Sequence, residues 1–287
     1  MRFLIDYCAL VGVAALTLIG PFQTQTGQLS AETVARRVQD RDTGHDSRLT
    51  FRMRLFDRHN RVRERVMMVA GLRGRTAPGA SATAPEGDRL LIRFTYPNDI
   101  RGTSFLVWEH PNADDERFLY LPSLGRVRRI AGTETQESFV GSDFTYEEIS
   151  GREFDEYTYV FASPDAERAS WAPPSGGPAR EAWRLESKRK DASAQFPRVV
   201  SVVLKDSFVV VQADIYNRRN EKQKVYTVGR LELVEKIWTV MSSVMTNALE
   251  KSRTELDVEA VDYNVGLKEA DFSRRELERG VSRSPAP

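Results

Sequence analysis

Short stretches of alternating apolar and polar residues recur along most of this chain. From Leu49 to Leu55 the odd-numbered positions are apolar and the even-numbered ones polar, and Val62, Val66 and Met68 then alternate with arginines. A period of two is typical of a strand with one buried face. No long helical pattern lies between these stretches, so antiparallel hairpins and meanders are the economical connections. The sequence therefore predicts an all-β fold with few helices.

The other expected elements continue this rhythm. Ser30 is a suitable N-cap for one short helix over 31–38. Two segments rich in Pro, Gly, Ala and Ser, 74–88 and 163–180, are predicted to be exposed loops inside one domain that spans 29–281, followed by a disordered tail at 282–287. Further strands are expected at 90–96, 103–109, 117–121, 126–130, 156–161, 182–187, 199–204, 208–216, 224–240 and 253–263.

The N-terminal segment has the features of an export signal. Residues 1–28 contain an apolar run from Ala9 to Ile19, which is too short for a comfortable membrane span. Asp6 and the lack of an Ala-x-Ala site leave an uncleaved anchor as the alternative. The sole cysteine, Cys8, lies in this run, so the exported chain is expected to fold without a disulfide.

Catalytic and metal-binding patterns are missing from the sequence. His45, His59 and His110 stand singly, without the spacing of metal ligands. No Gly-x-Ser-x-Gly, Gly-x-Gly-x-x-Gly or Walker-type loop occurs. The 42 basic and 41 acidic residues nearly cancel, which gives no reason to expect a nucleic-acid partner. We expect no enzymatic activity, no metal and no cofactor.

The apolar strand faces allow two interpretations. They could form an ordinary closed core, or part of a concave face could be left for acyl chains. Methionine and aromatic residues on the expected strands favour the second, since methionine adapts to ligands of varied shape. The candidate lipid-binding residues are Leu49, Phe51, Met53, Leu55, Val66, Met68, Phe105, Trp108, Phe118 and Tyr120.

A basic strand precedes an acidic turn. Strand alternation places Arg126 and Arg128 on one face and Arg129 on the other. Asp143 lies in a turn that leads into a short helix over 144–149. Arg129 and Asp143 are therefore candidates for a structural latch, while a solvated basic face is the alternative.

Four motifs follow one another in this part of the chain: Arg101-Gly102-Thr103, Tyr120-Leu121-Pro122, Arg128-Arg129-Ile130 and Gly141-Ser142-Asp143-Phe144-Thr145-Tyr146. Their order resembles the core of the outer-membrane lipoprotein-sorting (LolA-like) family, and the likeness continues to residue 277. The resemblance implies a curved antiparallel sheet that forms an incomplete barrel. It also implies a lid, for which the chain offers the helix at 30–39 and small helical segments near 141–149 and 268–278.

The same resemblance implies a function. It suggests a periplasmic carrier that binds lipid or lipoprotein acyl chains and passes them toward the outer membrane, with a resistance-nodulation-division-type exporter as donor or acceptor. The alternative is a periplasmic sensor of the same fold that binds a membrane-bound regulatory protein.

Overall fold

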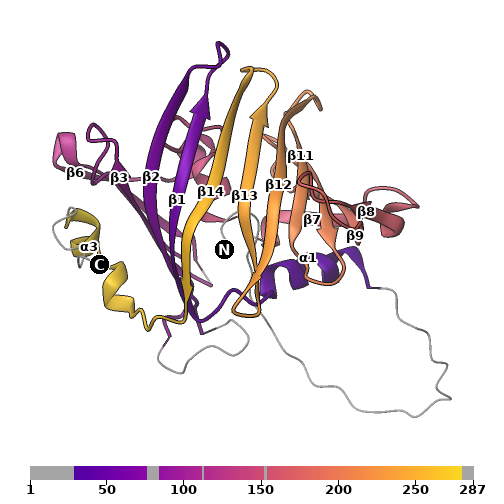
Figure 1. Ribbon diagram of the computed structural model, residues 1–287, viewed down its shortest axis with the longest axis horizontal. Coiled ribbons are helices and arrows are strands. Elements are labelled where there is room, and N and C mark those ends of the chain that lie inside the picture. Colours follow the sequence, from indigo (N-terminus) through magenta and orange to yellow (C-terminus); the bar gives the residue numbers. More distant parts are fainter. Residues whose placement is uncertain (1–28, 76–83, 112, 152–153, 280–287) are drawn as a thin grey trace.

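A single 14-stranded antiparallel sheet dominates the protein, shown as a computed structural model in Figure 1. The structure describes residues 29–75, 84–111, 113–151 and 154–279. The predicted leader or anchor at 1–28, with Cys8, and the predicted tail at 282–287 lie outside these residues. About half of the chain is in strands, which confirms the all-β fold class.

The strands are short to medium in length and follow the predicted order closely. They are β1 Asp46–Phe56, β2 Val62–Leu72, β3 Arg89–Tyr96, β4 Ser104–Trp108, β5 Glu116–Leu121, β6 Arg126–Arg129, β7 Tyr157–Phe161, β8 Ala169–Trp171, β9 Arg180–Arg189, β10 Arg198–Leu204, β11 Val210–Tyr216, β12 Lys222–Val234, β13 Ile237–Asn247 and β14 Ser252–Tyr263.

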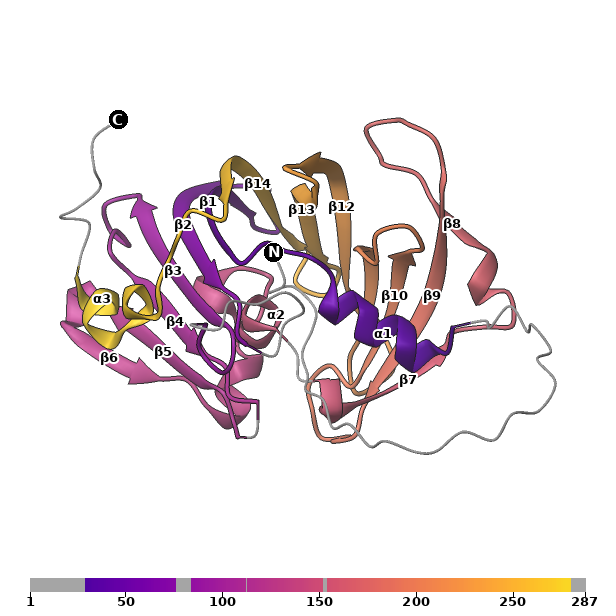
Figure 2. The same ribbon diagram turned by 90° about the horizontal axis from the view of Figure 1, so that it is seen from below.

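The strand order explains the shape of the sheet. From β1 the chain runs outward through neighbouring strands to β6 at one edge, and from β7 and β9 it runs back inward to β14, which pairs with β1. The sheet curves strongly but stays open, because β6 and β7 form its two ends (Figure 2). The chain must therefore cross the concave side between β6 and β7. This crossing includes α2, Tyr146–Ser150, which Figure 2 shows between the two halves of the sheet.

Two helical segments cover opposite faces of the sheet. The helix α1, Ala31–Asp40, begins at the predicted cap, where the Ser30 side chain accepts a hydrogen bond of 3.1 Å from the Thr33 amide. Its apolar side packs into the core on the concave side. The C-terminal segment, with a 3₁₀ helix at Glu269–Phe272 and α3 at Arg274–Glu278, packs on the convex side of β2–β6. These elements match the positions of the short helices expected near 30–39, 141–149 and 268–278. The expectation that the segment at 268–278 is part of a lid was wrong, because Phe272 and Leu277 pack on the convex side.

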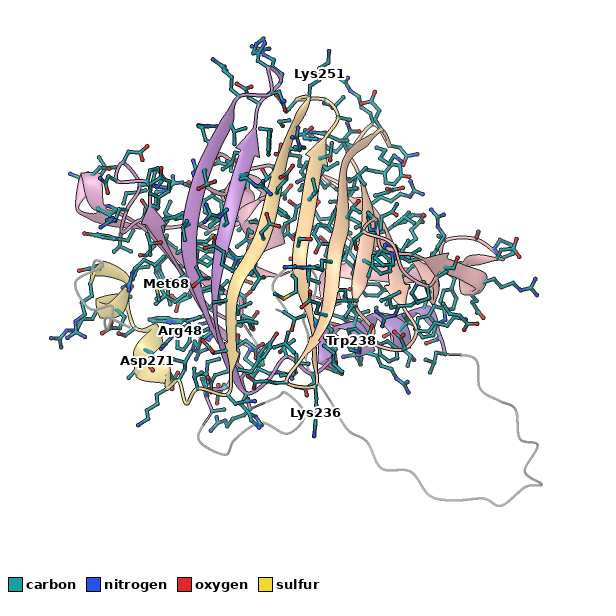
Figure 3. All side chains as sticks on the ribbon, viewed as in Figure 1. Arg48, Met68, Lys236, Trp238, Lys251 and Asp271 are labelled. Atoms are coloured by element: carbon teal, nitrogen blue, oxygen red, sulfur yellow. The ribbon has the colours of Figure 1, made fainter. Side chains whose placement is uncertain are left out.

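One expected strand is two strands. The prediction of a strand over 224–240 was wrong, because β12 ends at Val234 and β13 begins at Ile237. The turn between them places Glu235 and Lys236 at positive φ, a hairpin conformation usually marked by Gly or Asn. Lys236 and Lys251 mark the opposite ends of β13 in Figure 3. A second difference is that β8 lies inside the predicted loop at 163–180.

Candidate functional site: the capped concave face

The concave face of the sheet is apolar across its centre. Phe51 and Met53 on β1 face the same way as Met67 on β2 and as Leu256 and Val258 on β14, and all five side chains are buried. A β-bulge between Thr50 and Phe51 shifts the register of β1 against β14 by one residue, so that apolar side chains of both strands stay on the same face. The result is a continuous apolar surface on the inner side of the sheet.

A crossing segment covers this surface. We call residues 131–151 the cap segment; it contains 3₁₀ helices at Gly132–Gln136 and Phe139–Gly141 in addition to α2. The ring centroid of Phe139, in this segment, lies 5.6 Å from that of Phe105 and 5.9 Å from that of Phe94, and both of these residues are on the sheet. Tyr146 packs at 5.3 Å against Phe105. The underside of the cap segment is thus aromatic and packs directly on the concave strands.

Basic side chains hold the cap segment to the first half of the sheet. Arg65 on β2 donates to the Val140 carbonyl. Arg117 on β5 donates to the Ser150 hydroxyl at 2.9 Å and pairs with Asp115 at 2.8 Å. Arg128 on β6 reaches Glu134 at 3.2 Å. Burial lowers the pKa of Arg65 and raises the pKa of Asp115, so these two groups lie largely away from water, whereas the Arg128–Glu134 pair is exposed.

A buried ion pair holds the cap segment to the second half. The Lys224 ammonium on β12 donates to the Glu148 carboxylate at 2.6 Å and to the Asp143 carbonyl at 3.0 Å. Lys224 is 2% exposed and Glu148 is 3% exposed, so the pair is desolvated. The same Glu148 closes a capping box with Thr145 at the start of α2. Arg189 on β9 donates from one guanidinium nitrogen, Nη1, to both carboxylate oxygens of Glu147, at 2.7 and 2.9 Å.

The predicted latch has different partners. Asp143 accepts hydrogen bonds from the Ser252 and Thr254 hydroxyls on β14, and its amide donates to Thr254 at 2.9 Å. The predicted pairing with Arg129 was wrong, because Arg129 stands opposite Phe118 on the convex face and is exposed. The predicted division of the basic strand is confirmed, since Arg128 faces the cap segment and Arg129 faces away.

The ten candidate lipid-binding residues divide between the two faces. Leu49, Phe51, Met53, Leu55 and Phe105 line the concave side and belong to the main core.

The structure places the other five on the convex side, because neighbouring residues of a strand point to opposite faces. Val66 and Met68 stand opposite Arg52 and Thr50, and Met68 is 36% exposed (Figure 3). Trp108, Phe118 and Tyr120 pack with the C-terminal segment, where the Trp108 indole donates to the Phe272 carbonyl at 2.6 Å. These five residues are therefore not part of the surface that contains Phe51.

The residues that sequence reasoning missed are the anchors of the cap segment. Lys224, Glu148 and Arg189 come from distant parts of the chain, and no local motif links them. A capping-box signal, Thr145 followed by Glu148, was present and could have marked the start of α2. Arg65 and Arg117 carry a weaker signal, since each places a charge at an inward position of a strand.

The described part of the chain offers no group of metal-ligating side chains, and none of its helices is long and apolar enough to cross a membrane. What the arrangement can do is hold apolar groups between two aromatic and aliphatic layers. Tyr146 in this layer has a pKa raised by burial, which reflects the low polarity of the site.

Solved structures share this architecture. A DUF1329 family protein from Desulfovibrio piger is 28% identical and superposes with a TM-score of 0.74, over 86% of this chain and 97% of that one. A domain from Vibrio parahaemolyticus named for outer membrane lipoprotein sorting is 26% identical, with a TM-score of 0.73 over 87% of this chain and 98% of that one. A LolA superfamily protein from Nitrosomonas europaea, 13% identical, has a TM-score of 0.63 over 87% and 100% of the two chains and so shows the fold alone.

A search of curated proteins finds no match to this chain. A family model with the description "Uncharacterized protein" matches residues 86–279, which includes the cap segment, Lys224 and the C-terminal segment. The match covers more than half of the chain, and the resemblance to lipoprotein-sorting proteins agrees with the solved relatives. The protein therefore belongs to the family that this model describes, and its fold is that of the LolA-like proteins.

Proposed function

We propose that the protein is a periplasmic carrier that binds acyl chains between the concave face and the cap segment. One observation supports this most: the apolar inner face of an open sheet is covered, beside α1, by a crossing segment that is aromatic underneath and anchored by polar side chains. Polar anchors around an apolar layer allow the segment to be lifted as a unit. The rings of Phe139 and Tyr146 occupy the position that acyl chains would take.

The free energy of transferring acyl chains into water explains why a carrier is needed. Each methylene removed from water is worth about 0.8 kcal/mol, so a free lipid crosses an aqueous gap slowly unless an apolar surface shelters it. Acyl chains that replace the aromatic underside of the cap segment exchange one apolar contact for another. The anchors to Lys224 and Asp143 then decide how readily the cap segment opens.

The finer parts of the proposal have separate support. The periplasmic location rests on the predicted leader at 1–28 and on the family resemblance, and it agrees with a solved relative that is named for outer membrane lipoprotein sorting. Transport toward the outer membrane, and an inner-membrane exporter as donor or acceptor, rest on the family resemblance. The proposal that the protein is not an enzyme rests on the lack of a catalytic motif in the sequence.

Uptake of a fluorescent acyl chain tests the proposal. The parent protein should bind cis-parinaric acid saturably. Asp143→Ala removes the bonds to Ser252 and Thr254 and should speed uptake severalfold by weakening one anchor. Arg129→Ala is the matched control, because Arg129 is exposed on the opposite face.

Two results would count against the carrier. The first is a parent protein that shows no saturable binding of the acyl probe. The second is identical uptake by the parent and Asp143→Ala, which would mean that the cap segment does not control access. A delipidated protein that instead captures a peptide from a membrane-bound regulator would favour the sensor alternative.

A further inference from the structure

A buried amide without a partner lies on the core side of α1. Gln39 follows Ala31, Val34, Ala35 and Val38 on the buried side of the helix, and it is 0% exposed. Neither its amide nitrogen nor its amide oxygen has a hydrogen-bond partner within the described residues. Buried polar groups in proteins are nearly always paired, so an unpaired amide calls for a physical reason.

Several other buried polar groups of the concave side are paired, as is usual. Glu148 is paired with Lys224, and Arg117 is paired with Asp115. Tyr263 and Thr239 share a hydrogen bond of 2.8 Å near the lower end of β13. Gln39 departs from this pattern although an apolar residue of the same shape, such as methionine, would avoid the desolvation penalty.

A second buried polar side chain, Ser243, lies on the strands near the C-terminal end of α1. Arg41, two residues beyond Gln39, donates to the Trp238 carbonyl at 3.4 Å. Burial raises the pKa of Tyr226 to about 12, and Ser243 and then Arg41 lower it from the value that burial alone would give. The Ser243 hydroxyl on β13 is buried beside the Tyr226 phenol. The apolar interior therefore holds two uncharged polar side chains: Gln39, which has no partner within the described residues, and Ser243, whose hydroxyl can make a further hydrogen bond beside Tyr226.

We propose that Gln39 is a specificity residue that binds the carbonyl group joining an acyl chain to its headgroup. This inference rests on the proposed function. The amide nitrogen of Gln39 can donate to an ester or amide carbonyl oxygen, and its own oxygen can accept from a hydroxyl or N–H group of the same ligand. Ser243 is the second donor within the apolar layer. The site thereby selects acyl esters and acyl amides over ethers and hydrocarbons of equal length.

A pair of matched lipids tests this selectivity. The affinities of 1-palmitoylglycerol and its ether analogue 1-hexadecylglycerol, which differ in the carbonyl oxygen, are measured by displacement of cis-parinaric acid. The parent should bind the ester about tenfold more tightly, or 1.4 kcal/mol. Gln39→Met should bind both equally, with the affinity for the ether unchanged, and should unfold at the same temperature as the parent or higher. Ser243→Ala should weaken the preference for the ester.

The outcomes separate this inference from the proposed function. Equal binding of ester and ether by the parent overturns the role of Gln39 and leaves the carrier intact. If Gln39→Met still prefers the ester, the role of Gln39 is also overturned and the carrier is left intact. A lower melting temperature of Gln39→Met has the same consequence, because the amide would then stabilise the fold. A parent that binds neither lipid overturns both proposals.

Discussion

Breaking the buried pair between Lys224 and Glu148 should destabilise the protein strongly. Lys224→Met leaves the Glu148 carboxylate, 3% exposed, without the ammonium at 2.6 Å. It also removes the bond to the Asp143 carbonyl and the contact of the ammonium with the Phe196 ring at 4.4 Å. Removing one partner of a buried pair typically costs about 3–5 kcal/mol, because the other charge stays buried.

The double variant Lys224→Met with Glu148→Gln isolates the pair. Glutamine can still accept the 2.8 Å hydrogen bond from the Thr145 amide, so the capping box is kept while both charges are removed. We expect the double variant to recover more than half of the free energy of unfolding that Lys224→Met loses. Urea unfolding of the four proteins in the cycle gives the coupling energy directly. For a chain of this size the single variant should melt about 10 °C lower.

Two results would refute this reasoning. If Lys224→Met unfolds within about 1 kcal/mol of the parent, the pair is not desolvated as the geometry indicates. If the double variant is as unstable as Lys224→Met, the loss comes from packing around Lys224 and not from an unpaired charge on Glu148.

Three other predictions address the faces of the sheet, a buried phenol and the leader. Phe51→Glu should lose more than about 4 kcal/mol of stability, because Phe51 is buried in the main core, whereas Met68→Glu on the convex face should change it by less than about 1 kcal/mol. Equal urea midpoints for the two variants would contradict this assignment of faces. Burial raises the pKa of Tyr226 to about 12. The stability that the neutral phenol gives the folded state is therefore complete below the ordinary pKa of 10 and is lost as the pH rises toward 12. Between pH 9 and 11 the free energy of unfolding of Tyr226→Phe should therefore fall less than that of the parent. If the two free energies fall in parallel, the pKa of Tyr226 is not raised by burial. A reporter fused after Gln28 should be exported; cytoplasmic activity would refute the leader, and retention in the inner membrane would favour the anchor.

The strands could be predicted because their signal is local. Alternation from Leu49 to Leu55 sets both the strand and its buried face, and the structure agrees. The hairpin at Glu235 and Lys236 could not be seen, since neither residue is one that usually marks positive φ. The alternation of Val66 and Met68 was visible, but a strand has two faces and the sequence does not say which is concave.

The site was harder to predict because its contacts are not local. Asp143 was correctly placed before a short helix, yet its partners Ser252 and Thr254 lie more than a hundred residues away. The pairing with Arg129 seemed reasonable from the two neighbouring motifs. It fails because Arg129 and the cap segment lie on opposite sides of β6, a fact set by the crossing from β6 to β7.

Mass spectrometry of lipid extracted from the natively purified protein tests the carrier most directly. The account predicts acyl-bearing lipid in a fixed ratio to the protein, retained in Met68→Glu and depleted when the anchor at Asp143 is removed, since a looser cap segment releases its ligand faster. Protein that is isolated without acyl lipid, and that takes up none from vesicles, would contradict it.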